Sequence, residues 1–275
     1  MIDTRFVPLL LKLLQSRFAG KWFKKLSLEE RKQILIRVWI GLNKGLNQRE
    51  RFEIIAKSYD NRLMKNYPLL DSRFQARIFG LFNLVNEIRL IDGDLVETGV
   101  GRGLSLATLV YAVSFFSLNK IVYGFDSFAG FPNASQEDLG PRVQEVNKAS
   151  GWETTSPEMV CSIFEFERQK PSTRSLLSEQ DVCVKLVPGF FHETMPDSLP
   201  DKIALLHVDC DLYGSYKIVL ENAVPRMSSG GIIVFDEYQD QCWPGAKKAV
   251  DEICTKYELQ LSYFEPLQRF FTKIP

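Results

Sequence analysis

The stretch Asp94-Leu-Val-Glu-Thr-Gly-Val-Gly-Arg-Gly-Leu-Ser105 decides the fold of this chain. The apolar pair Leu95-Val96 is typical of the end of a short buried strand, and three glycines follow it at alternate positions. The apolar run Leu104–Val113 then predicts a helix. A strand, a glycine turn and a helix in this order are how an α/β domain presents backbone N–H groups to a nucleotide-like ligand. A tight turn that only lets the helix pack closely is the alternative.

The acidic residue within this turn, Glu97, narrows the class of ligand. A dinucleotide-binding turn faces a pyrophosphate, which a carboxylate would repel. A cationic amine would be attracted instead, and the methionine tail of S-adenosylmethionine carries one. Glu97 therefore favours S-adenosylmethionine as the cofactor and disfavours a nicotinamide oxidoreductase.

The composition is that of a globular chain with an uneven charge distribution. Its 275 residues suffice for one large domain or two small ones, and 45% of them are hydrophobic, which is enough for a full core. The net charge is zero, but residues 1–66 hold 15 Lys and Arg against 6 Asp and Glu. A basic arm on an acidic body favours docking within or between chains, with an anionic membrane surface or an acidic partner as alternatives. We expect a homo-oligomer through the N-terminal helices and no nucleic-acid partner.

The sequence gives no sign of export or membrane insertion. No apolar run approaches the ~20 residues that a membrane-spanning helix needs, and no convincing signal-peptide cleavage site follows the apolar start. Five cysteines without a Cys-x-x-Cys pair favour neither a disulfide framework nor a zinc cluster. These features predict a cytoplasmic protein with reduced thiols.

The order of the predicted elements indicates an α/β domain that follows a helical extension. Residues 1–70 form the expected helical extension, and residues 71–275 form the expected catalytic domain, which begins with an amphipathic helix at Ser72–Ile91. Strands that alternate with helices indicate a mostly parallel sheet with helices on both faces. Residues 133–182 are predicted to be an insertion that acts as a lid. After the first core strand at Leu95, the expected strands are Ile121–Phe125, Val182–Val187, Ile203–Val208, Ile232–Phe235 and a closing antiparallel hairpin of Leu259–Phe264 and Phe270–Ile274; the expected later helices are Ser215–Val224 and Ala246–Tyr257.

Acidic residues end several of the predicted strands. Asp126 lies 23 residues past the last glycine of the turn, a spacing at which an acid accepts both hydroxyls of a ribose. Asp209, Asp236 and Glu237 end two further strands, and ligands bind beyond the carboxyl ends of such strands. Carboxylates at one edge repel one another unless a cation binds there, and oxygen ligands favour Mg²⁺. Capping of the following helices is the alternative, above all for Asp211.

Five segments between Asp92 and Lys256 together carry a family resemblance. They are Val96-Glu-Thr-Gly-Val-Gly-Arg-Gly103, Gly124-Phe-Asp-Ser-Phe-Ala-Gly-Phe-Pro132, Gly189-Phe-Phe-His-Glu-Thr-Met-Pro196, His207-Val-Asp-Cys-Asp-Leu-Tyr213 and Gly230-Gly-Ile-Ile-Val-Phe-Asp-Glu-Tyr238. With them the chain resembles the macrocin O-methyltransferase (TylF) family, whose S-adenosylmethionine- and Mg²⁺-dependent enzymes methylate sugar hydroxyls, often on antibiotics. The resemblance implies a Rossmann-like class I methyltransferase fold, with a seven-stranded sheet whose last strand is antiparallel. It also implies an O-methyltransferase that acts on a hydroxyl of a sugar or a glycosylated natural product.

The resemblance further implies which residues bind the cofactor. Glu97 and Ser105 would hold the amine and the carboxylate of the methionine part, and Asp126 would bind the ribose. The other residues expected at the cofactor are Thr98, Gly99, Gly103, Ser127, Phe128, Gly189, Phe190 and Asp209.

The metal ligands implied by the resemblance are Asp209, Asp236 and Glu237. Family members usually have two aspartates where this chain has Asp236-Glu237. Because glutamate is one methylene longer, Glu237 is expected to bind through water or in a different manner. Our hypothesis for Asp209 is that it serves both as a metal ligand and as the catalytic base.

Three rival functions stay open at the level of sequence. Asp209-Cys-Asp211 after an apolar strand matches the DxD signature of metal-dependent glycosyltransferases, although it explains neither Glu97 nor Asp236. A catechol-like acceptor with two adjacent oxygens would suit the metal site as well as a sugar. A non-catalytic scaffold that kept the fold is the third alternative.

Overall fold

The computed structural model describes residues 72–140, 155–161 and 184–275. The helical extension predicted for residues 1–70 lies outside these ranges, as does most of the insertion predicted at 133–182. The homo-oligomer expected through the N-terminal helices therefore stays a prediction. Contacts divide the chain into the units Met1–Gln75 and Ala76–Pro275, and the fold below is that of the second unit.

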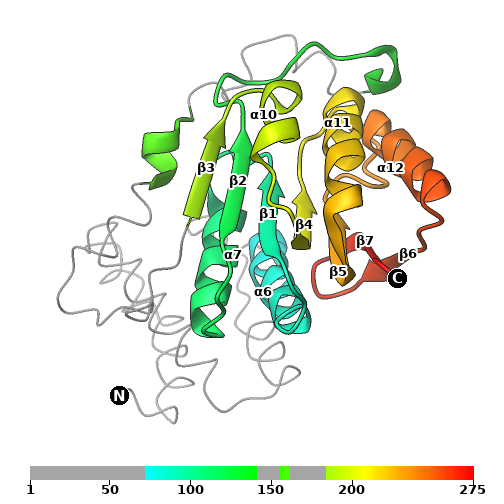
Figure 1. Cartoon of the computed structure of the whole chain (residues 1–275). Helices are drawn as coiled ribbons and strands as arrows, with labels where there is room; N and C mark the ends of the chain where they lie inside the picture. The colour runs from blue at the N-terminus through cyan, green and yellow to red at the C-terminus, as the bar shows by residue number, and fades with distance from the viewer. Residues whose placement is uncertain (1–71, 141–154, 162–183) are drawn as a thin grey trace, which may run out of the picture. The chain divides into compact units, whose positions relative to one another are not determined.

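Seven strands form one sheet. They are β1 (Asp94–Thr98), β2 (Val122–Asp126), β3 (Val184–Pro188), β4 (Ile203–Val208), β5 (Met227–Phe235), β6 (Leu261–Phe264) and β7 (Arg269–Lys273). Their spatial order is β3-β2-β1-β4-β5-β7-β6 (Figure 1). The first five are parallel to their neighbours, whereas β7 is antiparallel to both β5 and β6. This arrangement confirms the predicted seven-stranded, mostly parallel sheet with a closing hairpin.

Helices cover both faces of the sheet, as predicted. The helices labelled in Figure 1 are α6 (Ser72–Glu87), α7 (Leu104–Phe115), α10 (Phe191–Ser198), α11 (Tyr213–Ala223) and α12 (Pro244–Lys256). α6 and α7 pack on one face, and α10, α11 and α12 pack on the other. Within the described ranges no helix has the length and apolar character needed to cross a membrane.

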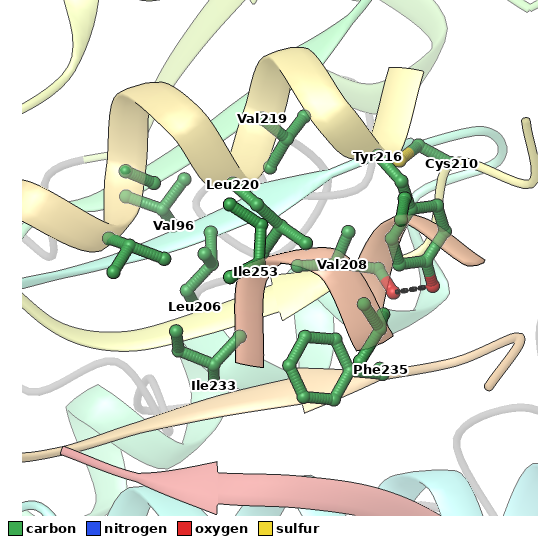
Figure 2. Packing of buried hydrophobic residues seen from close by; sticks show 14 of the residues in the cluster. Val96, Leu206, Val208, Cys210, Tyr216, Val219, Leu220, Ile233, Phe235 and Ile253 are labelled. Carbon is green, nitrogen blue, oxygen red and sulfur yellow. Dashed lines mark hydrogen bonds between the residues drawn. The ribbon is translucent and has the colours of Figure 1, made fainter. Parts of the chain in front are cut away.

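Side chains of the central strands alternate between the two faces, which produces two apolar cores. In β4, Leu206 and Val208 pack with α11 and α12, whereas Leu205 packs with α6 and α7. Figure 2 shows the first core, in which Leu220 and Tyr216 of α11 project toward the strands. The Tyr216 hydroxyl lies 3.0 Å from the Val208 carbonyl oxygen, so this buried polar group has a hydrogen-bond partner in the core.

Besides shifted ends, such as that of α6 at Glu87 instead of Ile91, two elements differ from those expected. Helix α10 occupies the segment between β3 and β4, where no element was predicted, and Pro196 within it obscures the helical pattern of a short segment. Strand β5 begins at Met227 instead of Ile232, so Gly230-Gly231 lie inside the strand and not in a turn before it. Gly230 keeps a positive φ of 79°, a conformation that favours glycine.

Two parts of the predicted insertion are described: residues 133–140, which include a short 3-10 helix at Gln136–Asp138, and residues 155–161, in which a helix starts at Pro157. Val160 on this helix is fully buried and belongs to the apolar cluster of α6 and α7. This segment is therefore anchored to the sheet domain. The role of residues 133–182 as a lid stays a prediction.

Truncation of Leu206 tests the assigned core. We expect Leu206→Ala to lower the free energy of unfolding by about 2–5 kcal/mol, because removing a fully buried side chain leaves a cavity under α11. Leu90→Ala is the matched control: Leu90 is 86% exposed, so its change should stay within about 0.5 kcal/mol. Urea unfolding followed by circular dichroism measures both values, and equal losses would contradict the assignment.

Candidate functional site

Three aspartates stand at the carboxyl ends of neighbouring parallel strands. The backbone N–H of Asp209 donates to the Thr98 carbonyl at 3.0 Å and that of Asp236 donates to the Val208 carbonyl at 2.9 Å, so both continue the sheet by one residue. Asp126 is the last residue of β2. The three carboxylates therefore share one edge of the sheet. The strand order reverses between β1 and β4, which is where open α/β sheets bind ligands.

Backbone geometry requires glycine in the turn between β1 and α7. Gly99 has a φ of +82°, and a Cβ placed on it would lie 1.6 Å from the carbonyl oxygen of Asp209. Gly103 has a φ of +83° and stands immediately before α7. The N–H of Gly101 donates to Oδ2 of Asp126 at 2.8 Å. The turn is thus held against the strand ends on both sides of β1.

Asp126 is oriented by backbone donors. Its Oδ2 accepts from Gly101, and its Oδ1 accepts from the Phe128 N–H at 2.8 Å. Ser127 closes the following loop by donating to the Gly130 carbonyl at 2.6 Å. A carboxylate oxygen offers about two lone pairs, so each oxygen of Asp126 keeps one for a ligand hydroxyl. This geometry fits the predicted ribose contact, which stays a prediction.

Glu97 and His207 form a buried pair inside the sheet. They are 1% and 0% exposed, and Oε1 of Glu97 lies 3.3 Å from Nδ1 of His207. Burial raises the pKa of Glu97, and the His207 hydrogen bond opposes that shift. The other carboxylate oxygen, Oε2, is buried and has no hydrogen-bond partner among the described residues. A buried acceptor without a donor is a strong indication of a ligand contact, and an ammonium group fits it.

Arg77 of α6 lies between two of the strand-end aspartates. Its Nη1 donates to Oδ2 of Asp209 at 2.5 Å, and its Nη2 donates to Oδ2 of Asp236 at 2.6 Å. Nη1 also donates to Oγ of Ser105, in the first turn of α7, at 3.1 Å. Arg269 of β7 donates to Oδ1 of Asp236 through Nε at 3.0 Å. Two guanidinium groups therefore balance the acid pair.

The same contacts shift the pKa values of the buried groups. Burial alone would raise the pKa of Asp236, but His207, Arg77 and Arg269 hold it well below its usual range. Burial alone would lower the pKa of His207, but its contacts with Asp236 and Glu97 raise it to about 9. These two carboxylates favour the protonated form of the His207 ring, and its Nε2 faces Oδ1 of Asp236 at 3.7 Å.

Glu237 is directed toward α11. Its Oε2 accepts from the Tyr216 hydroxyl at 2.6 Å and from the Asp211 N–H at 3.4 Å. Burial, together with the nearby charges of Asp209 and Asp211, raises the pKa of Glu237 well above its ordinary value. Its role as a third metal ligand stays a prediction.

His207, Asp209 and Asp236 form the candidate metal centre. One ligand atom from each lies within 4.8 Å of the others, so within the described ranges these three side chains could hold a metal ion together. Two aspartate carboxylates suit Mg²⁺, whereas imidazole is a less typical ligand for it and here already contacts Glu97. The donor set of Asp209 and Asp236 therefore fits a hard divalent cation.

The segment after β3 lies on the other side of β2 from the acid pair. The N–H of Gly189 donates to the Asp126 carbonyl at 2.9 Å, and Gly189 has a φ of +134°. The Phe190 ring stacks on His192, with ring centroids 6.0 Å apart and planes inclined by 19°. Gly189 and Phe190 thus stand beside Asp126, the residue predicted to bind the ribose, and their expected contact with the cofactor stays a prediction.

A family model described as macrocin-O-methyltransferase (TylF) matches residues 72–267. The chain belongs to this family. The match includes the glycine turn, the strand-end acids and Arg77. It confirms the resemblance stated from the five sequence motifs.

Two curated relatives align with this chain over part of their length. Demethyldecarbamoylnovobiocin O-methyltransferase of Streptomyces niveus is 33% identical over 171 residues, which cover 62% of this chain and 61% of the relative. The 8-demethyl-8-(2,3-dimethoxy-alpha-L-rhamnosyl)-tetracenomycin-C 4'-O-methyltransferase of Streptomyces olivaceus is 33% identical over 156 residues, which cover 55% and 56%. The chain thus matches about three fifths of the length of these relatives.

Among solved structures, the O-methyltransferase NovP superposes with a TM-score of 0.59 and 28% identity. The superposition covers 72% of this chain and 79% of NovP. It confirms the predicted class I methyltransferase fold.

Three residues of the site were not predicted from the sequence. They are Arg77, His207 and Arg269. The sequence could have indicated Arg77, because its helical spacing from the buried residues Leu81 and Leu84 places a charged side chain on the apolar face of α6. His207 lies within a quoted motif but received no role. Arg269 left no signal, since its partner comes from another strand.

Gly99→Ala tests the close approach of the turn to β4. The new Cβ would collide with the Asp209 carbonyl at a positive φ, so we expect the free energy of unfolding to fall by about 1–3 kcal/mol. Gly214→Ala is the control, because its Cβ would meet nothing within 4 Å and Gly214 lies in α11, where alanine gains up to about 1 kcal/mol. If both variants have the same stability in urea unfolding, the approach is not as tight as described.

Proposed function

We propose that this protein is an S-adenosylmethionine- and Mg²⁺-dependent O-methyltransferase that methylates a hydroxyl of a sugar or a glycosylated natural product. The observation that carries the proposal is Oε2 of Glu97, a buried carboxylate oxygen without a partner in the described structure, beside the glycine turn. An ammonium group such as that of methionine provides both the donor and the charge that this oxygen lacks. Membership of the TylF family supports methyl transfer as the reaction.

The β1–β2 half of the site would hold the cofactor. S-adenosylmethionine, when bound, supplies a sulfonium methyl group that is already a strong electrophile. Glu97 would accept the ammonium and Asp126 the ribose hydroxyls, while Gly99 and Gly103 keep the backbone open to close approach. The contribution of these residues is orientation, which can account for a large part of a rate enhancement.

The β4–β5 half of the site would hold the metal and act on the acceptor. Mg²⁺, when bound, lowers the pKa of the acceptor hydroxyl and fixes its orientation. Asp209 and Asp236 would hold the ion, with Glu237 as the further predicted ligand. Asp209 would also act as the base that takes the proton of the acceptor hydroxyl.

The names of the relatives support a sugar hydroxyl as the acceptor. The name of the Streptomyces olivaceus relative describes a rhamnosyl-bearing tetracenomycin as its substrate. A catechol-like acceptor remains the second candidate, because two adjacent oxygens would suit the same acid pair. Family membership argues against a DxD glycosyltransferase. That interpretation also assigns no role to Glu97.

A methyl-transfer assay tests the proposal. The full chain is incubated with S-adenosylmethionine, MgCl₂ and either a rhamnosylated polyketide or a catechol, and mass spectrometry scores the added methyl group. We expect methylation of the glycosylated acceptor, and a fall in kcat/KM of about 10²–10⁴-fold for Asp209→Asn, because the base is lost. Asp201→Asn, at an exposed position, is the control. If the protein binds S-adenosylhomocysteine but forms no methylated product, the proposal that it is a methyltransferase is wrong. If Asp209→Asn binds metal and keeps full turnover, Asp209 is not the base.

Glu97→Gln tests the cofactor contact separately. The amide keeps the shape of the side chain but removes its charge, so we expect the affinity for S-adenosylhomocysteine to fall by about 10–100-fold. Glu221→Gln, on the exposed side of α11, should leave that affinity unchanged. Isothermal titration calorimetry measures both, and an unchanged affinity of Glu97→Gln would place the ammonium elsewhere.

A further inference from the structure

The guanidinium of Arg77 lies where the two proposed metal-binding carboxylates face each other. Each of its two terminal nitrogens donates to a different carboxylate, Nη1 to Asp209 at 2.5 Å and Nη2 to Asp236 at 2.6 Å. Both bonds reach an Oδ2 atom, so one rigid fork engages one oxygen of each carboxylate. Arg77 is therefore a bridge between the acids and not a contact at the rim.

A divalent cation held by both acids would compete with Arg77 for the same pair of carboxylates. Mg²⁺ binds carboxylate oxygens at about 2.0–2.1 Å, and an ion shared by Asp209 and Asp236 would lie between them, in the space that Arg77 spans. The guanidinium and the ion would also repel each other at such short range. The two cations are thus alternatives for one position.

We propose that Arg77 is a resident counter-ion that a divalent metal must displace from Asp209 and Asp236. This inference rests on the metal site of the proposed function. Arg77 acts as a positioning residue: it holds the two carboxylates together in the metal-free protein and lowers the apparent affinity for metal. Loading of the metal and release of Arg77 are one coupled event.

The surroundings of Arg77 allow its side chain to move while its backbone stays in place. Leu81 and Leu84, one and two turns later on α6, are fully buried. Gly80 lies so close to Leu267 that a Cβ on it would come within 2.4 Å of the Leu267 Cβ, so α6 is held against the β6–β7 turn. The side chain of Arg77 itself is 23% exposed. Displacement therefore requires a change of rotamer and no movement of the helix.

Ser105 offers the displaced side chain a second partner. Its Oγ already accepts from Nη1 of Arg77 at 3.1 Å and lies on α7, away from β5. A guanidinium that leaves the acid pair keeps this hydrogen bond available. The cost of releasing Arg77 is reduced accordingly.

Arg269 provides a matched comparison because it touches only one of the acids. Its Nε and Nη2 donate to Asp236 at 3.0 and 3.4 Å, and no bond from it to Asp209 is found in the described structure. Removing Arg269 deletes the same charge near the site but leaves the bridge in place. Removing Arg77 deletes both the charge and the bridge.

The test is metal binding by the full chain, measured as free Mn²⁺ by electron paramagnetic resonance and as Mg²⁺ binding by isothermal titration calorimetry. We expect Arg77→Gln to bind Mn²⁺ at least about tenfold more tightly than the wild type, because no bridge has to be displaced. Arg269→Gln should give a clearly smaller increase. Arg77→Lys keeps the positive charge but cannot donate to both acids through one guanidinium, so we expect an intermediate affinity for Mn²⁺. This variant replaces Arg77→Gln in the test if Arg77→Gln does not fold.

The outcomes separate this inference from the function on which it rests. If Arg77→Gln and the wild type bind Mn²⁺ equally, or the variant binds it more weakly, Arg77 is no competitor although the metal site stands. If Arg269→Gln gains as much affinity for Mn²⁺ as Arg77→Gln, the gain comes from removing any positive charge near the site, and the bridge between the two acids has no part in it. If no variant binds Mn²⁺ or Mg²⁺, both the inference and the metal part of the proposed function fail.

Discussion

The structure depends on a balance of charge at the carboxyl edge of β1, β4 and β5. Glu97, Asp209 and Asp236 meet there because parallel strands end on the same side, and carboxylates this close repel one another. Leaving such groups buried without partners would be strongly destabilising. Cations supplied by α6, β4 and β7 compensate them. These cations are Arg77, His207 and Arg269.

This balance requires elements from both ends of the domain to meet. Arg77 precedes the first strand, and Arg269 belongs to the last one, yet both reach Asp236. The close contact of Gly80 with Leu267 is what brings α6 and the hairpin together. Apolar packing at a distance from the chemistry therefore positions the two guanidinium groups.

The same edge divides into a half suited to a nucleoside and a half suited to a cation. Asp126 and the glycine turn lie toward β2, and the acid pair lies toward β5. The two halves are joined through backbone, since Gly99 lies directly against the Asp209 carbonyl, and through side chains, since His207 contacts both Glu97 and Asp236. A change in one half is expected to reach the other without any large movement.

The sequence by itself determined the strands, the glycine turn and the acids at the strand ends, because each depends on residues that are neighbours along the chain. Helix α10 was not predicted from the sequence, since Pro196 contradicts the local helical pattern. Only the tertiary structure decided which acids meet and which cations balance them. Arg77 and Asp209 are far apart in sequence, and no local preference of either residue encodes their contact. Parallel strands and the docking of α6 bring them together, because burial favours opposite charges that are paired.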